Sequence, residues 1–196
     1  MEETQKISAY RLDPRPSRLT IRVTAGGLLS AFGHNPIIGV RDFGGQAEFD
    51  PGSPDSAKLH VQIPAGSLEV LGDVNEKDRR EIQQIMHQQV LESDSYPVIE
   101  FRSSEVKVTS TGAGQFRAEI SGELSLHGVT RPQTIVARVT ATGDRLRASG
   151  EFSIYQTEYG IQLVTVAGGA LKVKDELKAS FEVLASAVRD QDTAAA

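Results

Sequence analysis

The sequence contains no cysteine and no tryptophan, and only 6% of its 196 residues are aromatic. The absence of cysteine excludes disulfides, thiolate metal ligands and thiol nucleophiles together. The sequence also has no run of about 18 apolar residues, the length that a membrane-spanning helix requires. The formal net charge is -5, and no cluster of Lys and Arg stands out. The composition therefore predicts neither a nucleic-acid partner nor a polybasic membrane tether.

The sequence begins MEETQKISAYRLDP, without the basic and apolar segments that mark a secretory signal. For the chain as written we therefore expect a cytoplasmic location. The 196 residues, 39% of them hydrophobic, suffice for one large domain with a buried core. Neither a repeat nor a linker divides the chain. We expect one domain over residues 1–186, and a disordered tail over residues 187–196, where charged residues precede three alanines.

Alternation of apolar and polar residues dominates the chain and predicts antiparallel strands with one apolar face. In residues 18–24, for example, Leu19, Ile21 and Val23 share one face. Further alternating runs begin at Leu59, Ile99, Val106, Phe116, Ile135, Leu146 and Leu177. The runs give about eight or nine strands joined by short turns, the range in which a sheet closes into a barrel. The predicted fold class is all-β, with an antiparallel eight-stranded barrel.

Glycine-containing segments separate the alternating runs and predict hairpin turns at residues 111–114, 142–145 and 168–169. The apolar positions also change parity within one run. Ile99 and Phe101 are odd-numbered, whereas Val106 and Val108 are even-numbered. This change predicts a β-bulge or a break across residues 103–105.

Residues 76–91 depart from the alternation and predict a single amphipathic helix. The apolar positions with helical spacing are Ile82, Ile85, Met86, Val90 and Leu91. Asn75 is the expected N-cap, acidic residues follow in the first turn, and residues 93–97 end the helix. One amphipathic helix in an all-β chain must lay its apolar stripe on another element. We expect it at the mouth of the barrel, where it could act as a lid.

Small residues alternate with large ones on the apolar face of the predicted strands. They are Ala118, Gly122, Ala137, Ala141, Ala148, Gly150 and Ala179. Strand number and stagger fix the diameter of a barrel, so small side chains favour empty space in its lumen. An apolar void readily accepts an apolar guest. The alternative is a filled barrel in which small and large residues complement one another.

The sequence lacks the common catalytic, metal-binding and phosphate-binding motifs. We therefore expect no catalytic residue, no metal and no cofactor. His60 is expected on the polar face of a strand, His87 exposed at the helix edge, and His127 bonded to the local backbone of a turn. His34 differs, because it lies within the apolar segment AFGHNPIIGV. It is either a satisfied core or turn histidine, or a group that bonds the head group of an amphiphile.

Two motifs, SGELSLHGVTRP at residues 121–132 and YPVIEF at residues 96–101, carry a resemblance to a known family. They resemble the hallmark of the YceI-like family, lipocalin-like barrels that hold a polyisoprenoid or similar lipid in the lumen. The likeness extends from YRLD at residues 10–13 to residues 178–183, and includes the step Tyr159-Gly160-Ile161. It departs at residues 78–91, where many members have an Asp-x-His segment and this chain has DRREI. Many relatives are exported.

The resemblance implies a non-catalytic protein that binds, sequesters or transports a hydrophobic amphiphile in the barrel lumen. Candidate ligands are a polyisoprenoid, an isoprenoid quinone and a fatty-acid derivative. A long chain is favoured, because burial yields only about 0.8 kcal/mol per CH₂ against a substantial cost of association. The expected ligand-binding residues are Phe32, His34, Ile37, Phe43, Ile82, Ile85, Met86, Phe101, Leu124, Phe152, Tyr159 and Ile161. Two alternatives are a protein-interaction barrel without ligand and an enzyme that uses His34 as acid or base on a lumen-bound lipid.

Overall fold

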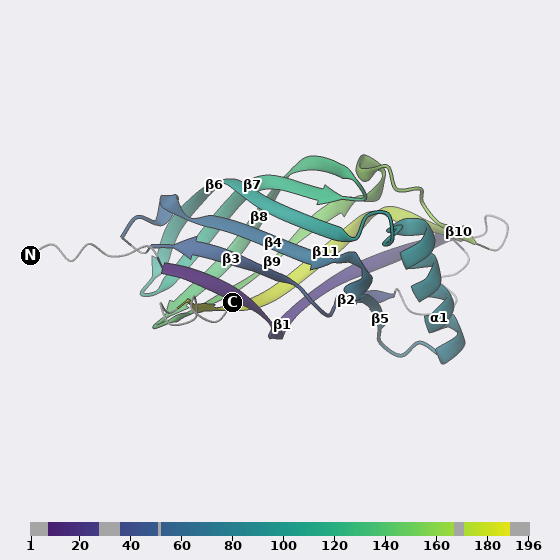
Figure 1. The fold of residues 1–196 in the computed structure, drawn as a ribbon, viewed down its shortest axis with the longest axis horizontal. Helices are drawn as coiled ribbons and strands as arrows, with labels where there is room; N and C mark the ends of the chain where they lie inside the picture. The colour runs from purple at the N-terminus through teal and green to yellow at the C-terminus, as the bar shows by residue number, and fades with distance from the viewer. Residues whose placement is uncertain (1–7, 28–35, 51, 167–170, 189–196) are drawn as a thin grey trace, which may run out of the picture.

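The computed structural model describes residues 8–27, 36–50, 52–166 and 171–188. Its strands form a closed antiparallel barrel, in which β11 returns to pair with β1 (Figure 1). The ring order is β1 (Ser8–Gly27), β3 (Gly44–Phe49), β4 (Lys58–Pro64), β6 (Val98–Gly112), β7 (Gln115–Leu126), β8 (Val129–Thr142), β9 (Arg145–Tyr155) and β11 (Leu171–Ala187). These elements confirm the predicted all-β, antiparallel, eight-stranded barrel.

Shorter elements are attached to this ring. Strand β2 (Ile37–Val40) pairs with the second half of β1, and β5 (Leu68–Leu71) pairs with β2. Strand β10 (Thr165–Val166) pairs with β11. Single turns of 3-10 helix are η2 (Pro54–Ser56), η3 (Ala65–Ser67) and η5 (Gln156–Tyr159). On one side, therefore, β1 contacts β3 with its first half and β2 with its second.

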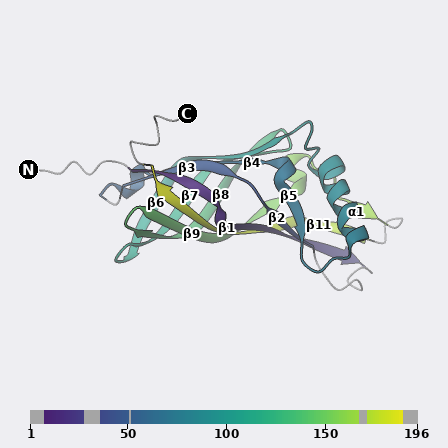
Figure 2. The ribbon, with the colours of Figure 1, turned by 60° about the horizontal axis from the view of Figure 1, so that its bottom comes forward.

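Helix α1 (Glu76–Ile85) lies across the end of the barrel beside β2 and β5 (Figure 2). Asn75 caps it as predicted, because the backbone N–H of Asp78 donates to Asn75 Oδ1 at 3.0 Å. The helix continues into one π-helical turn, η4 (Met86–Val90). The predicted helix at the barrel mouth is therefore confirmed, with a wider last turn than the spacing indicated.

The β6–β7 register shifts between Ser103 and Glu105, which confirms the bulge predicted from parity. The hairpin turns near residues 112 and 143 are also as predicted, with Gly114 and Gly143 at positive φ. The third predicted turn, at residues 168–169, lies outside the described residues. These local features follow from side-chain period and turn chemistry, which the sequence shows directly.

A second bulge was not expected from the alternation. The β1–β11 register shifts between Asp13 and Arg18, and β1 bends sharply near its label in Figure 1. This segment includes Pro14 and Pro16, which have no backbone N–H to donate to a neighbouring strand. The prolines therefore interrupt the ladder in the middle of the longest strand.

The core has two parts that follow the long axis of the barrel. The part nearest α1 includes a layer that we call the helix-end layer: Ile38, Leu68, Val70, Met86, Leu91, Tyr159 and Ile161, all buried. The part at the opposite end is built around Tyr10, Leu12, Phe43, Phe49, Leu146 and Ala185. The α1 end thus receives side chains from β2, β5, η4 and η5 in addition to the ring strands.

The last described residues belong to the barrel. Strand β11 reaches Ala187, and the N–H of Val188 donates to the carbonyl of Ala9 at 2.7 Å. Ordered structure thus extends two residues into the predicted tail, and residues 189–196 lie outside the described part. No helix among the described residues has the length and apolar composition needed to cross a membrane.

Candidate ligand-binding cavity

A cavity of about 200 Å³ lies within the barrel, and apolar side chains make up most of its wall. The chain has seven phenylalanines, and six of them line this cavity. They are Phe43, Phe49, Phe101, Phe116, Phe152 and Phe181. The lining comes from every ring strand, from Phe43 in the segment between β2 and β3, and from Ala57 just before β4. The cavity is therefore built by the alternation of the strands.

Two charged residues, Glu48 and Lys58, contribute to the wall. Their neighbours Ala47, Phe49 and Leu59 line the cavity, so the period of two directs both charged side chains outward. There they pair with each other, with Lys58 Nζ 3.4 Å from Glu48 Oε2. The described wall thus offers a hydrocarbon surface without a charged group aimed inward.

The small inward residues have two different outcomes. Ala118, Ala137 and Ala148 line the cavity, as an open lumen requires. Gly122 and Gly150 leave no space, because the rings of Phe101 and Phe181 lie over them. A Cβ atom at either glycine would come within 2.8 Å of the covering ring and closer still to a backbone oxygen. Aromatic rings therefore fill the glycine positions, whereas these three alanines border the void; Ala141 and Ala179 do not line it.

The size of the cavity sets what it can hold. An apolar cavity of about 150 Å³ is enough to bind benzene, whereas pockets for drug-sized ligands measure about 300–1,000 Å³. At about 200 Å³ the cavity accommodates a short segment of hydrocarbon. A longer chain requires lining side chains to change rotamer.

The predicted ligand-binding residues fall into separate places. Phe43, Phe101, Leu124 and Phe152 line the cavity together. Met86, Tyr159 and Ile161 are buried in the helix-end layer and do not line it, and Ile82 and Ile85 are half-buried on α1. Ile37 points away from the lumen and is 38% exposed. Phe32 and His34 lie outside the described residues.

Sequence reasoning missed other aromatic residues of the wall. Phe49, Phe116 and Phe181 line the cavity but were not among the candidates. Phe116 and Phe181 stand on the apolar parity of their strands, so the alternation already placed them inward. Phe49 packs edge-to-face on Phe116, with ring centroids 5.2 Å apart, which closes the end of the cavity far from α1.

The helix-end layer separates the cavity from α1. Tyr159 is only 1% exposed, and burial raises the pKa of its hydroxyl, as does the nearby Glu158 carboxylate. Leu68, Val70 and Met86 pack in the same layer at 8% exposure or less. The space directly under the helix is therefore filled with side chains.

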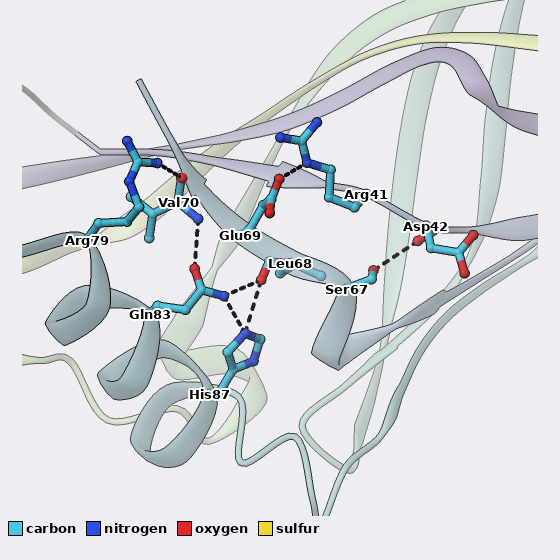
Figure 3. A network of polar contacts seen from close by, with 9 residues as sticks. All are labelled: Arg41, Asp42, Ser67, Leu68, Glu69, Val70, Arg79, Gln83 and His87. Carbon is cyan, nitrogen blue, oxygen red and sulfur yellow. Dashed lines mark hydrogen bonds and ion pairs between the residues drawn. The ribbon is translucent and has the colours of Figure 1, made fainter. Parts of the chain in front are cut away.

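Polar side chains fasten α1 to the free edge of β5 (Figure 3). The Gln83 amide donates to the Leu68 carbonyl at 2.7 Å and accepts from the Val70 N–H at 2.9 Å, as the backbone of a neighbouring strand would. Arg79 donates to the carbonyl oxygens of Val70 and Gly72. Each of these hydrogen bonds contributes about 1 kcal/mol to stability, and those from the charged Arg79 contribute more. Together they stabilise the packing of α1 against β5.

His87 belongs to the same network. Its Nε2 lies 2.6 Å from Gln83 Nε2 and 3.0 Å from the Leu68 carbonyl oxygen, and its Nδ1 lies 2.9 Å from Ser93 Oγ. The exposed position expected from the sequence is wrong, because the ring is half-buried between η4 and β5. Helical periodicity placed His87 at the edge of the stripe but could not show that β5 packs there.

The two family motifs meet in space. The Tyr96 ring packs against His127 with centroids 4.5 Å apart and the ring planes tilted by 54°, and it covers Gly128. His127 Nδ1 lies 3.2 Å from the carbonyl oxygen of Tyr159, and Nε2 lies 3.2 Å from a carboxylate oxygen of Glu92. The expected bond from His127 to local backbone is wrong, because its backbone partner is 32 residues away. The motifs thus tie the β7–β8 turn to η5 and to the segment after η4.

On the outer face, His60 has the polar-face position that the sequence predicted. Its Nε2 lies 2.7 Å from Glu100 Oε1, which also accepts from Arg102 and Gln62. The hydrogen bonds from Arg102, His60 and Gln62 lower the pKa of Glu100 to about 2. Within the described ranges, no group of three or more His, Asp and Glu side chains could hold a metal ion.

Two solved structures superpose on most of this chain. BcnA of Burkholderia cenocepacia superposes with a TM-score of 0.69 at 18% identity, covering 89% of this chain and 99% of that one. A polyisoprenoid-binding domain from Saccharophagus degradans, implicated in plant cell wall breakdown, gives 0.66 at 16% identity and covers 93% and 100%. At these identities the likeness shows a shared fold.

Sequence comparison adds bacterial relatives described only as UPF0312 proteins. The relative from Azotobacter vinelandii is 31% identical over 141 residues, which are 68% of this chain and 68% of that protein. The relative from Pseudomonas savastanoi is 32% identical over 117 residues, which are 59% of this chain and 55% of that protein. The model of the YceI-like domain matches residues 10–185, nearly the whole barrel. The chain therefore belongs to the YceI-like family.

Proposed function

We propose that this protein binds a hydrophobic amphiphile and carries or sequesters it, with the hydrocarbon part in the barrel cavity. The observation that carries this proposal is the cavity of about 200 Å³ whose wall includes six phenylalanines. Each methylene group moved from water into such a cavity contributes about 0.8 kcal/mol. The polar head group has no charged partner within the described wall, so it remains at the protein surface.

The ligand class rests on the chemistry of the wall and on family membership. A wall of alkyl and aromatic groups suits a polyisoprenoid, an isoprenoid quinone tail or a fatty-acid derivative. The similar barrel from Saccharophagus degradans is a polyisoprenoid-binding domain, which favours an isoprenoid chain. The charged residues at the wall, Glu48 and Lys58, pair with each other on the outside, which favours binding over catalysis.

Native mass spectrometry of the purified protein, followed by organic extraction, tests the proposal. We expect an added mass that disappears on extraction and that has the formula of a long-chain lipid. A mass equal to that of the bare chain from two expression hosts, with no uptake of added polyprenols, quinones or fatty acids, would contradict it.

A variant that fills the cavity makes the test specific. Ala137 lines the cavity and is 1% exposed, so Ala137→Leu places three more carbons in the space that the ligand needs. We expect less co-purifying lipid, with a destabilisation of about 1–3 kcal/mol from overpacking. Ala113→Leu, in an exposed hairpin turn, is the matched control and should retain the full amount of lipid.

A further inference from the structure

The barrel wall contains a seam on one side of β1. Residues 8–11 of β1 pair with β3, and residues 20–22 pair with β2. Residues 12–19 lie between these two pairings and face residues 41–43, the connector that joins β2 to β3. Among the described residues, no hydrogen bond joins residues 12–19 to this connector. We call this boundary the seam.

The bulge in β1 forms its hydrogen bonds within itself and with β11. The N–H of Arg15 donates to Asp13 Oδ1, and Ser17 Oγ donates to the Asp13 carbonyl. Ser17 Oγ also accepts from the N–H of Leu184 on β11. The two prolines in the bulge have no N–H to offer. These hydrogen bonds of Asp13, Arg15 and Ser17 are therefore all made without the connector.

The connector is bonded in the opposite direction, toward η3 and β5. The N–H of Arg41 donates to the Ser67 carbonyl at 3.1 Å, and Ser67 Oγ donates to the Asp42 carbonyl at 3.0 Å. Arg41 also forms an ion pair with Glu69 of β5. Figure 3 shows this connector and α1 attached to the same strand. The seam is therefore the border between two separate hydrogen-bonded systems.

Apolar side chains pack on both sides of the seam. Phe43, at the end of the connector, packs against the part of the core that contains Leu12. Phe43, Leu12 and Leu19 all line the cavity, and Phe43 is 4% exposed. Movement of the Phe43 ring would therefore loosen this part of the wall without breaking a backbone hydrogen bond among the described residues.

The α1 end offers a more costly path. A chain passing beneath the helix must displace the packed helix-end layer, whose residues do not line the cavity. It must also break the bonds that Arg79, Gln83 and His87 form with β5 and Ser93. Unpaired polar groups in a partly buried site are unfavourable, so this path opens more rarely than the seam.

We infer that the hydrocarbon chain of the ligand enters and leaves sideways through the seam, with Phe43 as the gate, and not beneath α1. The inference rests on the proposed function, because it describes the route to the same cavity. The ligand class it fits is an amphiphile with a slender, flexible chain and a head group that stays outside the barrel.

The absence of cysteine from the chain allows a test that needs no ligand. Leu12→Cys places a single thiol behind the seam, and Met86→Cys places one in the helix-end layer. The two parent residues are equally exposed, at 8%. We expect the thiol at position 12 to react with N-ethylmaleimide at least about tenfold faster than the thiol at position 86. Exposure of position 86 requires one or two additional hydrogen bonds to break, and their free energy corresponds to that factor. Equal rates, or faster labelling at position 86, would overturn the seam as the opening part of the wall.

Phe43→Ala sharpens this test. Combined with Leu12→Cys it should speed labelling further, whereas combined with Met86→Cys it should leave the rate unchanged. If Leu12→Cys does not fold, Leu19→Cys on the other side of the bulge replaces it, with half-buried Val90→Cys in η4 as its control. An equal effect of Phe43→Ala at both ends would indicate general loosening and contradict a gate.

Uptake kinetics connect the seam with the ligand. With cis-parinaric acid as a fluorescent probe, Phe43→Ala should raise both the association and the dissociation rate several-fold, and Gln83→Ala should change neither. A faster rate in Gln83→Ala alone would place the route under α1 and overturn the inference. Failure of the wild-type protein to take up any lipid chain would contradict the proposed function. In that case, faster thiol labelling at position 12 than at position 86 would still identify the seam as the opening part of the wall.

Discussion

At the α1 end of the barrel, Leu68, Val70 and Tyr159 are 4% exposed or less and do not line the cavity. In the other part, around Phe116 and Leu146, strands of the same alternating pattern enclose about 200 Å³ of empty space. Both regions belong to one barrel, whose strand number and stagger fix one diameter. The difference therefore arises from what is added to the ring.

The added elements account for the filled end. Strands β2 and β5, the turn η4 and the turn η5 each direct buried apolar side chains into the helix-end layer. The hollow part receives its side chains from the ring strands, from Phe43 and from Ala57, and several of those side chains are alanines. In this barrel, empty space remains in the region that the ring strands fill almost alone. Substitutions of matched type in the two regions test this difference.

The largest expected effect concerns two leucines. Leu68→Ala removes a side chain from the packed end, whereas Leu146→Ala removes one that already borders the cavity. We expect a loss of about 3–5 kcal/mol for Leu68→Ala and about 2–3 kcal/mol for Leu146→Ala, because a side chain beside empty space has fewer contacts to lose. Denaturant unfolding measures both values, and an equal loss at both positions would mean that the two regions are packed alike.

A second prediction concerns the glycine beneath the Phe101 ring. At Gly122 a Cβ atom would lie 2.2 Å from the Arg102 carbonyl oxygen and 2.8 Å from the ring. Gly122→Ala should therefore cost at least about 1–3 kcal/mol of unfolding free energy. Gly44→Ala is the control, since no atom lies within 4 Å of its Cβ, and it should be neutral or slightly stabilising. A tolerated Gly122→Ala would show that Phe101 can move aside and that the cavity wall is soft there.

The attachment of α1 gives a third, smaller effect. Gln83→Ala leaves the Val70 N–H and the Leu68 carbonyl without the partners that the Gln83 amide provides. We expect a loss of about 1–3 kcal/mol and faster hydrogen exchange at the Val70 amide. Gln84→Ala, on the exposed side of the same helix, should change stability by less than about 0.5 kcal/mol. Unchanged protection of Val70 in Gln83→Ala would argue that the helix is held by its apolar face alone.

The smallest expected effect on stability concerns Glu100 on the outer face of the barrel, outside both of these regions. Folding lowers the pKa of Glu100 from 4.5 to about 2, so its contribution to stability is present above pH 4.5 and is lost as the pH falls toward 2. Glu100→Gln should make the acid limb of the stability profile less steep over that range. Lipid uptake at neutral pH should not change. A change in uptake would indicate that the outer network and the cavity are coupled.

Local sequence signals predicted most of the fold. The period-two alternation predicted the strands, the parity change predicted the bulge near residue 104, and Asn75 predicted the start of α1. The candidate site was predicted only in part. Alternation assigned Phe101, Leu124 and Phe152 to the inner face, and they line the cavity. It could not distinguish them from Tyr159 and Ile161, which are also buried but lie in the helix-end layer.

The sequence by itself determined which side chains face inward, because that property depends on the pleat of each strand and the turn of one helix. Only the tertiary structure decided which inward positions remain empty. A ring from a neighbouring strand covers Gly122, whereas Ala137 faces open space, and no local pattern separates the two. The seam was also decided at that level, because it depends on how β1 divides its pairing between β2 and β3. Packing and strand register bring together residues that are far apart in the chain. The cavity is the space that their side chains do not fill.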